Sequence, residues 1–123
     1  MKKNKPKLLV VDDMLTVREA IQYYFEGKDY IILTAASAGE ALPIIKEENP
    51  DIMLSDINLP QMSGIDLIKS IRQFNNKIKI IIVSGCNLDL RKDPQLKTLD
   101  ISDILDKPVD FEKLEAVIKK AVV

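Results

Sequence analysis

Short apolar runs alternate along this chain with longer segments in which apolar residues recur every three or four positions. A short apolar run bounded by turn-forming or acidic residues is typical of a buried strand, whereas the longer spacing is typical of a helix with one buried face. Five strands are therefore predicted, at residues 8–11, 30–34, 52–54, 78–83 and 101–105. A predicted helix follows each of them.

The predicted helices carry start and stop signals. Ser37 and Glu40 fit a capping box, so a helix is expected over about residues 38–48. Pro43 lies inside it and predicts a kink or a late start, because proline removes a backbone donor. Asp93-Pro94 reads as an N-cap followed by proline at the first helical position, which predicts a short fourth helix. The third helix is expected to carry Ile68, Ile71 and Phe74 on one side and to end at Asn75-Asn76.

This alternation of strand and helix is typical of a parallel sheet covered by helices on both faces. We therefore expect an α/β protein, a three-layer α/β/α sandwich with a five-stranded parallel sheet. A chain of 123 residues with 46% hydrophobic content suits one domain with a proper core, so we expect a single domain over residues 1–123. The basic residues 1–6 are expected to form a flexible N-terminal tail.

The composition of the chain narrows the range of functions and partners to be expected. Eighteen basic and nineteen acidic residues give a net charge of −1, so no general field attracts nucleic acid or an anionic membrane. No apolar run approaches the roughly 18 residues of a membrane span, so no membrane insertion is expected. The single cysteine, Cys86, excludes an internal disulfide and fits a reducing, cytoplasmic location. The chain has no histidine, so any histidine chemistry must come from a partner.

Polar residues stand where the predicted strands end: Asp12 and Asp13 after the first, Asp56 after the third, Ser84 after the fourth and Lys107 after the fifth. Each alone has a simpler interpretation as a helix cap, a turn residue or a surface charge. Because the carboxyl ends of parallel strands share one edge of the sheet, we expect these side chains to meet.

Repulsion between the carboxylates indicates that further positive charge is needed if these side chains meet. Two carboxylates about 5 Å apart repel by roughly 3 kcal/mol at an effective dielectric near 20, and Lys107 offers one positive charge against three acids. An all-oxygen site favours Mg²⁺, with Mn²⁺ as a second candidate. Asp56 would then be a nucleophile in phosphoryl transfer, with Lys107 and the Ser84 hydroxyl on phosphoryl oxygens. Pro108 would fix the loop that carries Lys107.

These motifs together resemble the response-regulator receiver domains of two-component signalling, the CheY-like superfamily. The matching stretches are Leu-Val-Val-Asp12-Asp13, Asp51-Ile-Met-Leu-Ser-Asp56 with Pro60, Met62 and Gly64, Val83-Ser84-Gly85, and Lys107-Pro108. The resemblance implies a flavodoxin-like fold with strand order 2-1-3-4-5. It implies that Asp56 accepts a phosphoryl group from a sensor histidine kinase or a histidine phosphotransfer protein, and that Lys107-Pro108 is cis. The implied Mg²⁺ ligands are Asp12, Asp13, Asp56 and the backbone carbonyl of Asn58.

The chain departs from the family pattern at the positions that report phosphorylation. Ile104 stands where relatives commonly have an aromatic residue, so a switch pairing Ser84 with residue 104 would use a smaller apolar side chain. Asp100-Ile101 replaces a frequent Gly-Ala pair. Asn58 and Cys86 occupy positions that influence hydrolysis in relatives, and a thiol orients water poorly, so self-dephosphorylation is not expected to be especially fast.

The output is expected to pass through contact with an unknown protein target and not through direct contact with nucleic acid. By analogy, the kinase would dock around Met14, Leu15 and Arg18. The chain would not be an enzyme beyond catalysing its own phosphorylation and dephosphorylation. The main alternative is a phosphorylation-independent, receiver-like interaction module. A flavodoxin-like electron carrier is disfavoured because Asp12-Asp13 would repel a flavin phosphate, and a hydrolase of free substrates because no further base is visible.

Overall fold

The computed structural model describes residues 5–85 and 92–122, in which five strands and five helices alternate. In chain order they are β1 (Lys7–Val11), α1 (Leu15–Phe25), β2 (Ile31–Ala35), α2 (Ala38–Glu48), β3 (Ile52–Asp56), α3 (Gly64–Arg72), β4 (Lys79–Ser84), α4 (Pro94–Lys97), β5 (Asp103–Asp106) and α5 (Phe111–Val122). The predicted alternation is confirmed. Cys86 lies outside the described residues.

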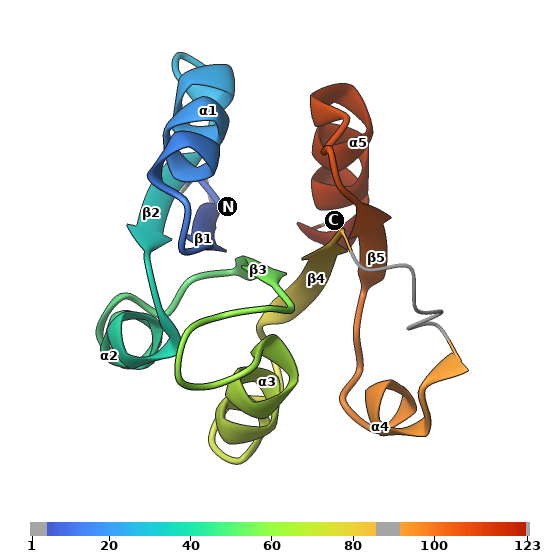
Figure 1. The fold of residues 1–123 in the computed structure, drawn as a ribbon. Coiled ribbons are helices and arrows are strands. Elements are labelled where there is room, and N and C mark those ends of the chain that lie inside the picture. The colour runs from blue at the N-terminus through green and yellow to red at the C-terminus, as the bar shows by residue number, and fades with distance from the viewer. Residues whose placement is uncertain (1–4, 86–91, 123) are drawn as a thin grey trace.

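All five strands run parallel in one sheet of order β2-β1-β3-β4-β5, as the resemblance implies. Helices α1 and α5 cover one face, and α2, α3 and α4 lie on the other, which gives the expected three-layer sandwich (Figure 1). Within the described residues, no helix is both long enough and apolar enough to cross a bilayer.

The sheet separates two hydrophobic clusters because neighbouring side chains of a strand point to opposite faces. In β1, Leu8 and Val10 join Ile21, Phe25 and the α5 residues on one face. Leu9 and Val11 face the other cluster, which α2, α3 and α4 complete. Strands buried on both faces explain why the sequence shows continuous apolar runs and not an alternating pattern.

Helix α2 begins at Ala38 as the capping signal predicts: the Ser37 hydroxyl accepts a hydrogen bond from Glu40 N, and Glu40 Oε1 accepts one from Ala36 N. The late start suggested by Pro43 is therefore wrong, since this proline lies inside the formed helix. Asp93 caps α4 as predicted, accepting a hydrogen bond from Gln95 N.

Phe74 does not share the buried side of Ile68 and Ile71, contrary to the prediction, and α3 ends before the predicted Asn75-Asn76. Helix α3 ends at Arg72, so the helical spacing that would bury Phe74 no longer applies. Its side chain is 45% exposed, and the ammonium of Lys46 lies 5.0 Å from the ring centroid. Of the expected N-terminal tail, residues 1–4 lie outside the described part of the chain, whereas the Pro6 carbonyl accepts a hydrogen bond from Ile31 N.

Arg72 joins the end of α3 to the segment between α4 and β5. Its guanidinium donates to three backbone carbonyls, those of Leu99 (2.8 Å), Asp100 (3.0 Å) and Asn75 (3.2 Å). Asp100 has a left-handed backbone with φ of 57°, a conformation that glycine adopts at little steric cost. Asp100 is thus an aspartate in a glycine-like conformation, held through its carbonyl.

A second polar contact links α1 to α5 on the opposite face. The Tyr24 hydroxyl donates to Glu115 Oε1 at 2.8 Å. Lys28 and Lys119 form ion pairs with the same carboxylate at 3.5 and 3.7 Å. The hydrogen bond to Glu115, followed by burial, raises the pKa of Tyr24 to about 12.

Candidate functional site

Asp12, Asp56 and Lys107 meet at the carboxyl edge of the sheet, as the sequence predicts. Asp12 directly follows β1, Asp56 ends β3 and Lys107 directly follows β5. The Lys107 ammonium donates to Asp56 Oδ2 at 2.8 Å and to Asp12 Oδ2 at 3.1 Å. One cation therefore bridges two carboxylates that come from distant parts of the chain.

Both carboxylates are buried, and each of their oxygens accepts a hydrogen bond. Asp12 is 4% exposed and Asp56 is 8% exposed. Their second oxygens accept backbone hydrogen bonds, Asp12 Oδ1 from Met14 N at 2.9 Å and Asp56 Oδ1 from Asn58 N at 3.1 Å. Apolar side chains, including Val10 and Leu54, line a small cavity that also touches both acids. This environment strengthens electrostatic interactions because little water screens them.

The ammonium of Lys107 is held charged by these acids. Burial alone would lower the pKa of Lys107, but the hydrogen bonds that its ammonium donates to Asp56 and Asp12 outweigh burial and raise the pKa above the usual lysine value. The lysine is therefore a permanent positive charge at neutral pH, positioned to balance negative charge on neighbouring oxygens.

Asp13 completes an acidic group that fits a divalent cation. One oxygen each from Asp12, Asp13 and Asp56 lies within 4.8 Å of the others, and Asp13 is exposed to solvent. Neighbouring ligands in the octahedral shell of Mg²⁺ are about 3 Å apart and opposite ligands about 4.2 Å, so the three carboxylates would have to move closer together to share one ion. Three carboxylates and one ammonium leave two net negative charges, which one dication neutralises. The residues present fit Mg²⁺.

Gly64 brings the first turn of α3 against the backbone of Asp56. Its amide donates to the Ile57 carbonyl at 2.8 Å, and a Cβ built on it would lie 2.4 Å from the Asp56 carbonyl oxygen. No side chain fits at that distance. In the sequence Gly64 is only one residue of a stretch that resembles the family, whereas the structure shows that its missing side chain lets α3 pack directly beside Asp56.

Ser84 and Lys107 are joined through the backbone at the ends of β4 and β5. The Lys107 amide donates to the Ser84 carbonyl at 3.0 Å, and Ser84 is buried. Ser84 lies one residue beyond Val83, the register partner of Asp56. The Lys107–Pro108 peptide bond is cis, as the resemblance implies.

Comparison with known proteins identifies the family of this chain. Residues 8–119 match the family model described as the response regulator receiver domain. The chain belongs to this family.

Among curated proteins, this receiver domain is 30% identical over 114 residues to sporulation initiation phosphotransferase F of Bacillus subtilis (strain 168), a match covering 93% of this chain and 91% of that protein. It is 32% identical over 115 residues to the transcriptional regulatory protein ZraR of Escherichia coli (strain K12), covering 94% of this chain but 26% of ZraR. The crystal structure of a response regulator receiver protein from Pseudomonas putida superposes with a TM-score of 0.87 at 32% identity, covering 97% of this chain and 99% of that one. The fold is thus that of CheY-like receivers, which are signalling domains of two-component systems.

The beginning of α1 carries the three residues at which a kinase is expected to dock, Met14, Leu15 and Arg18. Met14 and Leu15 are exposed, at 54% and 56%. Arg18 instead turns back toward the site, where its guanidinium Nη1 donates to the Asp12 carbonyl at 2.7 Å. Sequence reasoning missed this contact because a bond to a backbone carbonyl leaves no signal in residue type.

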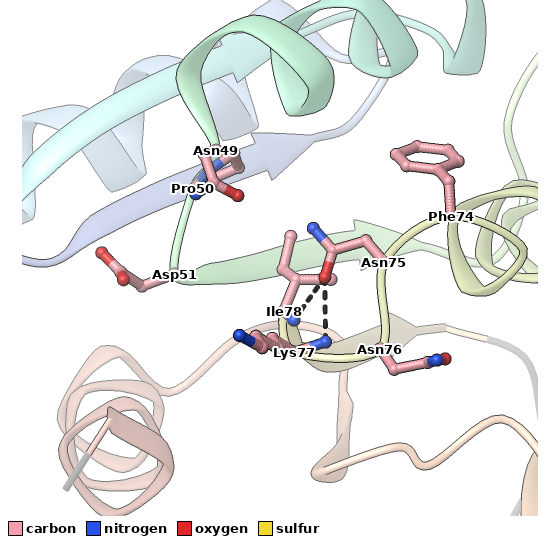
Figure 2. A pocket seen from close by; sticks show the side chains of 8 residues that line it. All are labelled: Asn49, Pro50, Asp51, Phe74, Asn75, Asn76, Lys77 and Ile78. Carbon is pink, nitrogen blue, oxygen red and sulfur yellow. Dashed lines mark hydrogen bonds between the residues drawn. The ribbon is translucent and has the colours of Figure 1, made fainter.

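The receiver domain has a larger open pocket, of about 470 Å³, at the opposite edge of the sheet (Figure 2). It is lined by Asn49, Pro50, Asp51, Phe74, Asn75, Asn76, Lys77 and Ile78. Its polar groups serve the fold: Asn75 Oδ1 accepts from the amides of Lys77 and Ile78, and Asp51 Oδ2 accepts from Lys7 N. The acidic group of the site lies at the other edge, and none of its residues lines this pocket.

Proposed function

We propose that this receiver domain is the phosphoacceptor of a two-component phosphorelay, with Asp56 as the residue that is phosphorylated. The donor is a phosphohistidine on a sensor histidine kinase or on a histidine phosphotransfer protein. The observation that carries the proposal is the pairing of Lys107 with Asp56 and Asp12 next to the solvent-exposed carboxylate of Asp13. Receiver domains as a family receive phosphoryl groups from such donors.

In the transfer, a carboxylate oxygen of Asp56 attacks phosphorus in line with the phosphorus–nitrogen bond. That bond breaks, its electron pair returns to the donor imidazole, and the new phosphorus–oxygen bond gives an aspartyl phosphate. Lys107 balances charge on one phosphoryl oxygen, and the Ser84 hydroxyl donates to another. Asp12, Asp13, Asp56 and the Asn58 carbonyl would hold Mg²⁺ or Mn²⁺, which supplies the remaining positive charge for the transferring phosphoryl group.

The output of the proposed receiver is a phosphorylation-dependent contact with a protein target, with Ser84 and Ile104 as the switch residues. Ile104 is buried in β5, beside the segment that Arg72 holds. The relative of similar length is named a phosphotransferase, which supports a relay role. Residues 1–123 then act as a single receiver domain in the cytoplasm, without direct contact with nucleic acid.

Intact-mass measurement after incubation with acetyl phosphate and Mg²⁺ tests the proposal. The wild type should gain one phosphoryl group, and Asp56→Asn should gain none, because an amide oxygen is a poor nucleophile. Asp51→Asn is a matched control, since Asp51 is another aspartate next to β3 but at the far edge of the sheet, and it should be phosphorylated like the wild type. A folded wild type that gains no mass with Mg²⁺ would support the phosphorylation-independent interaction module instead.

A further inference from the structure

Arg18 holds both ends of the turn that carries the acidic pair. Its guanidinium Nη1 donates to the Asp12 carbonyl at 2.7 Å, and its own backbone amide donates to the Met14 carbonyl at 3.2 Å. Arg18 belongs to the first turns of α1 and is partly buried. It lies behind the site, bound to the backbone of Asp12 and not to its carboxylate.

The turn depends on this contact because α1 is weakly capped. Within this fully described helix, Met14 is the N-cap without a side-chain cap bond, and no acidic residue stands in the first turn. The carboxylate of Asp12 takes the place of a cap by accepting from Met14 N. The same carboxylate also accepts from Lys107 and is part of the acidic group. When Asp12 turns an oxygen toward a cation, two hydrogen bonds still hold its backbone. The Asp12 amide donates to the Ala35 carbonyl, and the Arg18 guanidinium donates to the Asp12 carbonyl.

We propose that Arg18 is a positioning residue for divalent cation binding: it fixes the backbone of Asp12 so that the carboxylates of Asp12 and Asp13 stay aimed at the cation. This inference rests on the proposed function, because the cation is the one required for phosphorylation of Asp56. A charge-assisted bond to a backbone carbonyl is short and directional, which suits this role. Groups that orient ligands in this way typically contribute a factor of about 10 to 100 in metal affinity.

The direction in which Mg²⁺ affinity changes when Arg18 is replaced distinguishes positioning from simple electrostatics. Removing a positive charge near three carboxylates makes the site more negative, so charge alone would make a neutral variant bind Mg²⁺ more tightly. Loss of positioning has the opposite effect, because the carboxylates must then be ordered at the moment of binding. A neutral side chain of similar length at position 18 therefore gives opposite results under the two interpretations.

Isothermal titration of the metal-free protein with Mg²⁺ is the test. Arg18→Met should bind Mg²⁺ about tenfold more weakly than the wild type. Arg18→Lys keeps the charge and a hydrogen-bond donor, so its Mg²⁺ affinity should lie between those of the wild type and Arg18→Met. Lys113→Met is the control: it removes one positive charge from the exposed face of α5, and its affinity should stay within about twofold of the wild type, since exposed charges are largely screened.

A second measurement reports on the turn itself. Without metal, the amides of Asp13 and Met14 should exchange with deuterium about tenfold faster in Arg18→Met than in the wild type, whereas those of α5 should be unchanged. Equal or tighter Mg²⁺ binding by Arg18→Met, with the wild type binding normally, would overturn the role of Arg18 alone. A wild type that binds no Mg²⁺ would overturn the proposed function with it. If Arg18→Met does not fold, the intermediate affinity of Arg18→Lys decides.

Discussion

Lys107 Nζ lies 2.8 Å from Asp56 Oδ2, although the two residues are 51 positions apart in the chain. The same ammonium also reaches Asp12, so one lysine neutralises part of the charge that two buried acids bring to the sheet edge. It is not one of the groups that would hold the cation, and it stays available to a phosphoryl oxygen. Lys107 is therefore both a structural counter-ion and part of the proposed chemistry.

Replacing Lys107 should separate these two roles. Lys107→Met leaves Asp12 and Asp56 buried without their cation, and we expect a loss of about 3 kcal/mol in the free energy of unfolding without metal. Saturating Mg²⁺ should restore most of this loss, while phosphorylation by acetyl phosphate stays slower by about a hundredfold or more. Urea unfolding with and without Mg²⁺ measures the free energy of unfolding, and intact mass measures the rate of phosphorylation.

Lys79→Met is the control for this variant, because Lys79 is exposed at the start of β4, at the far edge of the sheet. Equal destabilisation of Lys107→Met with and without Mg²⁺ would contradict a counter-ion role.

The raised pKa of Lys107 sets the pH range over which its charge stabilises the folded domain. This stabilisation is complete below the usual lysine pKa. It disappears only as the pH rises through the higher pKa of the folded state.

A side chain at position 64 should disturb the phosphoacceptor directly. In Gly64→Ala, the new Cβ would lie 2.4 Å from the Asp56 carbonyl oxygen and 2.9 Å from Ile57 Cα, so backbone must move. We expect a loss of about 2 kcal/mol or more in the free energy of unfolding and slower phosphorylation of Asp56. Chemical denaturation and acetyl phosphate labelling provide the two measurements.

Gly39→Ala is the matched control. The new Cβ would meet only the Ser37 hydroxyl at 3.8 Å, an ordinary contact, in a formed helix. It should raise the free energy of unfolding by about 0.5 kcal/mol, because alanine restricts the unfolded chain. Similar losses in both variants would show that the effect at Gly64 is not one of close packing.

Asp100→Gly should leave the domain intact or make it slightly more stable. Glycine relieves the left-handed backbone of Asp100, and the bond from Arg72 survives because it goes to the carbonyl. We expect a gain of up to about 1 kcal/mol, partly offset by the greater freedom of glycine in the unfolded state. Thermal unfolding measures this, and a loss above 1 kcal/mol would mean that the aspartate side chain has a role of its own.

The tyrosine titration should show the contact between α1 and α5. Tyr24 should ionise at a pH of about 12, and Tyr24→Phe identifies its step in the ultraviolet absorbance of tyrosinate. Glu115→Leu removes the hydrogen bond and the negative charge, so the pKa of Tyr24 should fall toward the ordinary value near 10. Because the folded-state pKa is raised, this contact stabilises the domain below pH 10 and is lost between pH 10 and 12. An unchanged Tyr24 transition in Glu115→Leu would rule out Glu115 as the cause.

The sequence predicts the features that depend on residue type along a strand or helix. Apolar runs located the five strands, and the acids and the lysine at their ends identified a site whose charged side chains the structure brings together. The position of Phe74 was predicted wrongly because Asn75-Asn76 indicates a later end for α3, whereas the helix already ends at Arg72. The contacts of Arg18, Gly64 and Arg72 are with backbone atoms brought close only by folding, so no spacing of residues could reveal them.

The two-sided core also decides how a signal can travel. Side chains alternate between the two faces of the sheet, so Asp12 and Asp56 lie on the same face as Val10 and Leu54, toward α1 and α5. Ser84 lies on the opposite face, with Ile82 and Ile104. Under the proposed function, phosphorylation on one side of the sheet would therefore have to be communicated through its thickness, at the tip of β4, before a surface on the other side could respond. Inserting a single residue into β3 would invert that geometry while leaving the composition of the strand almost unchanged.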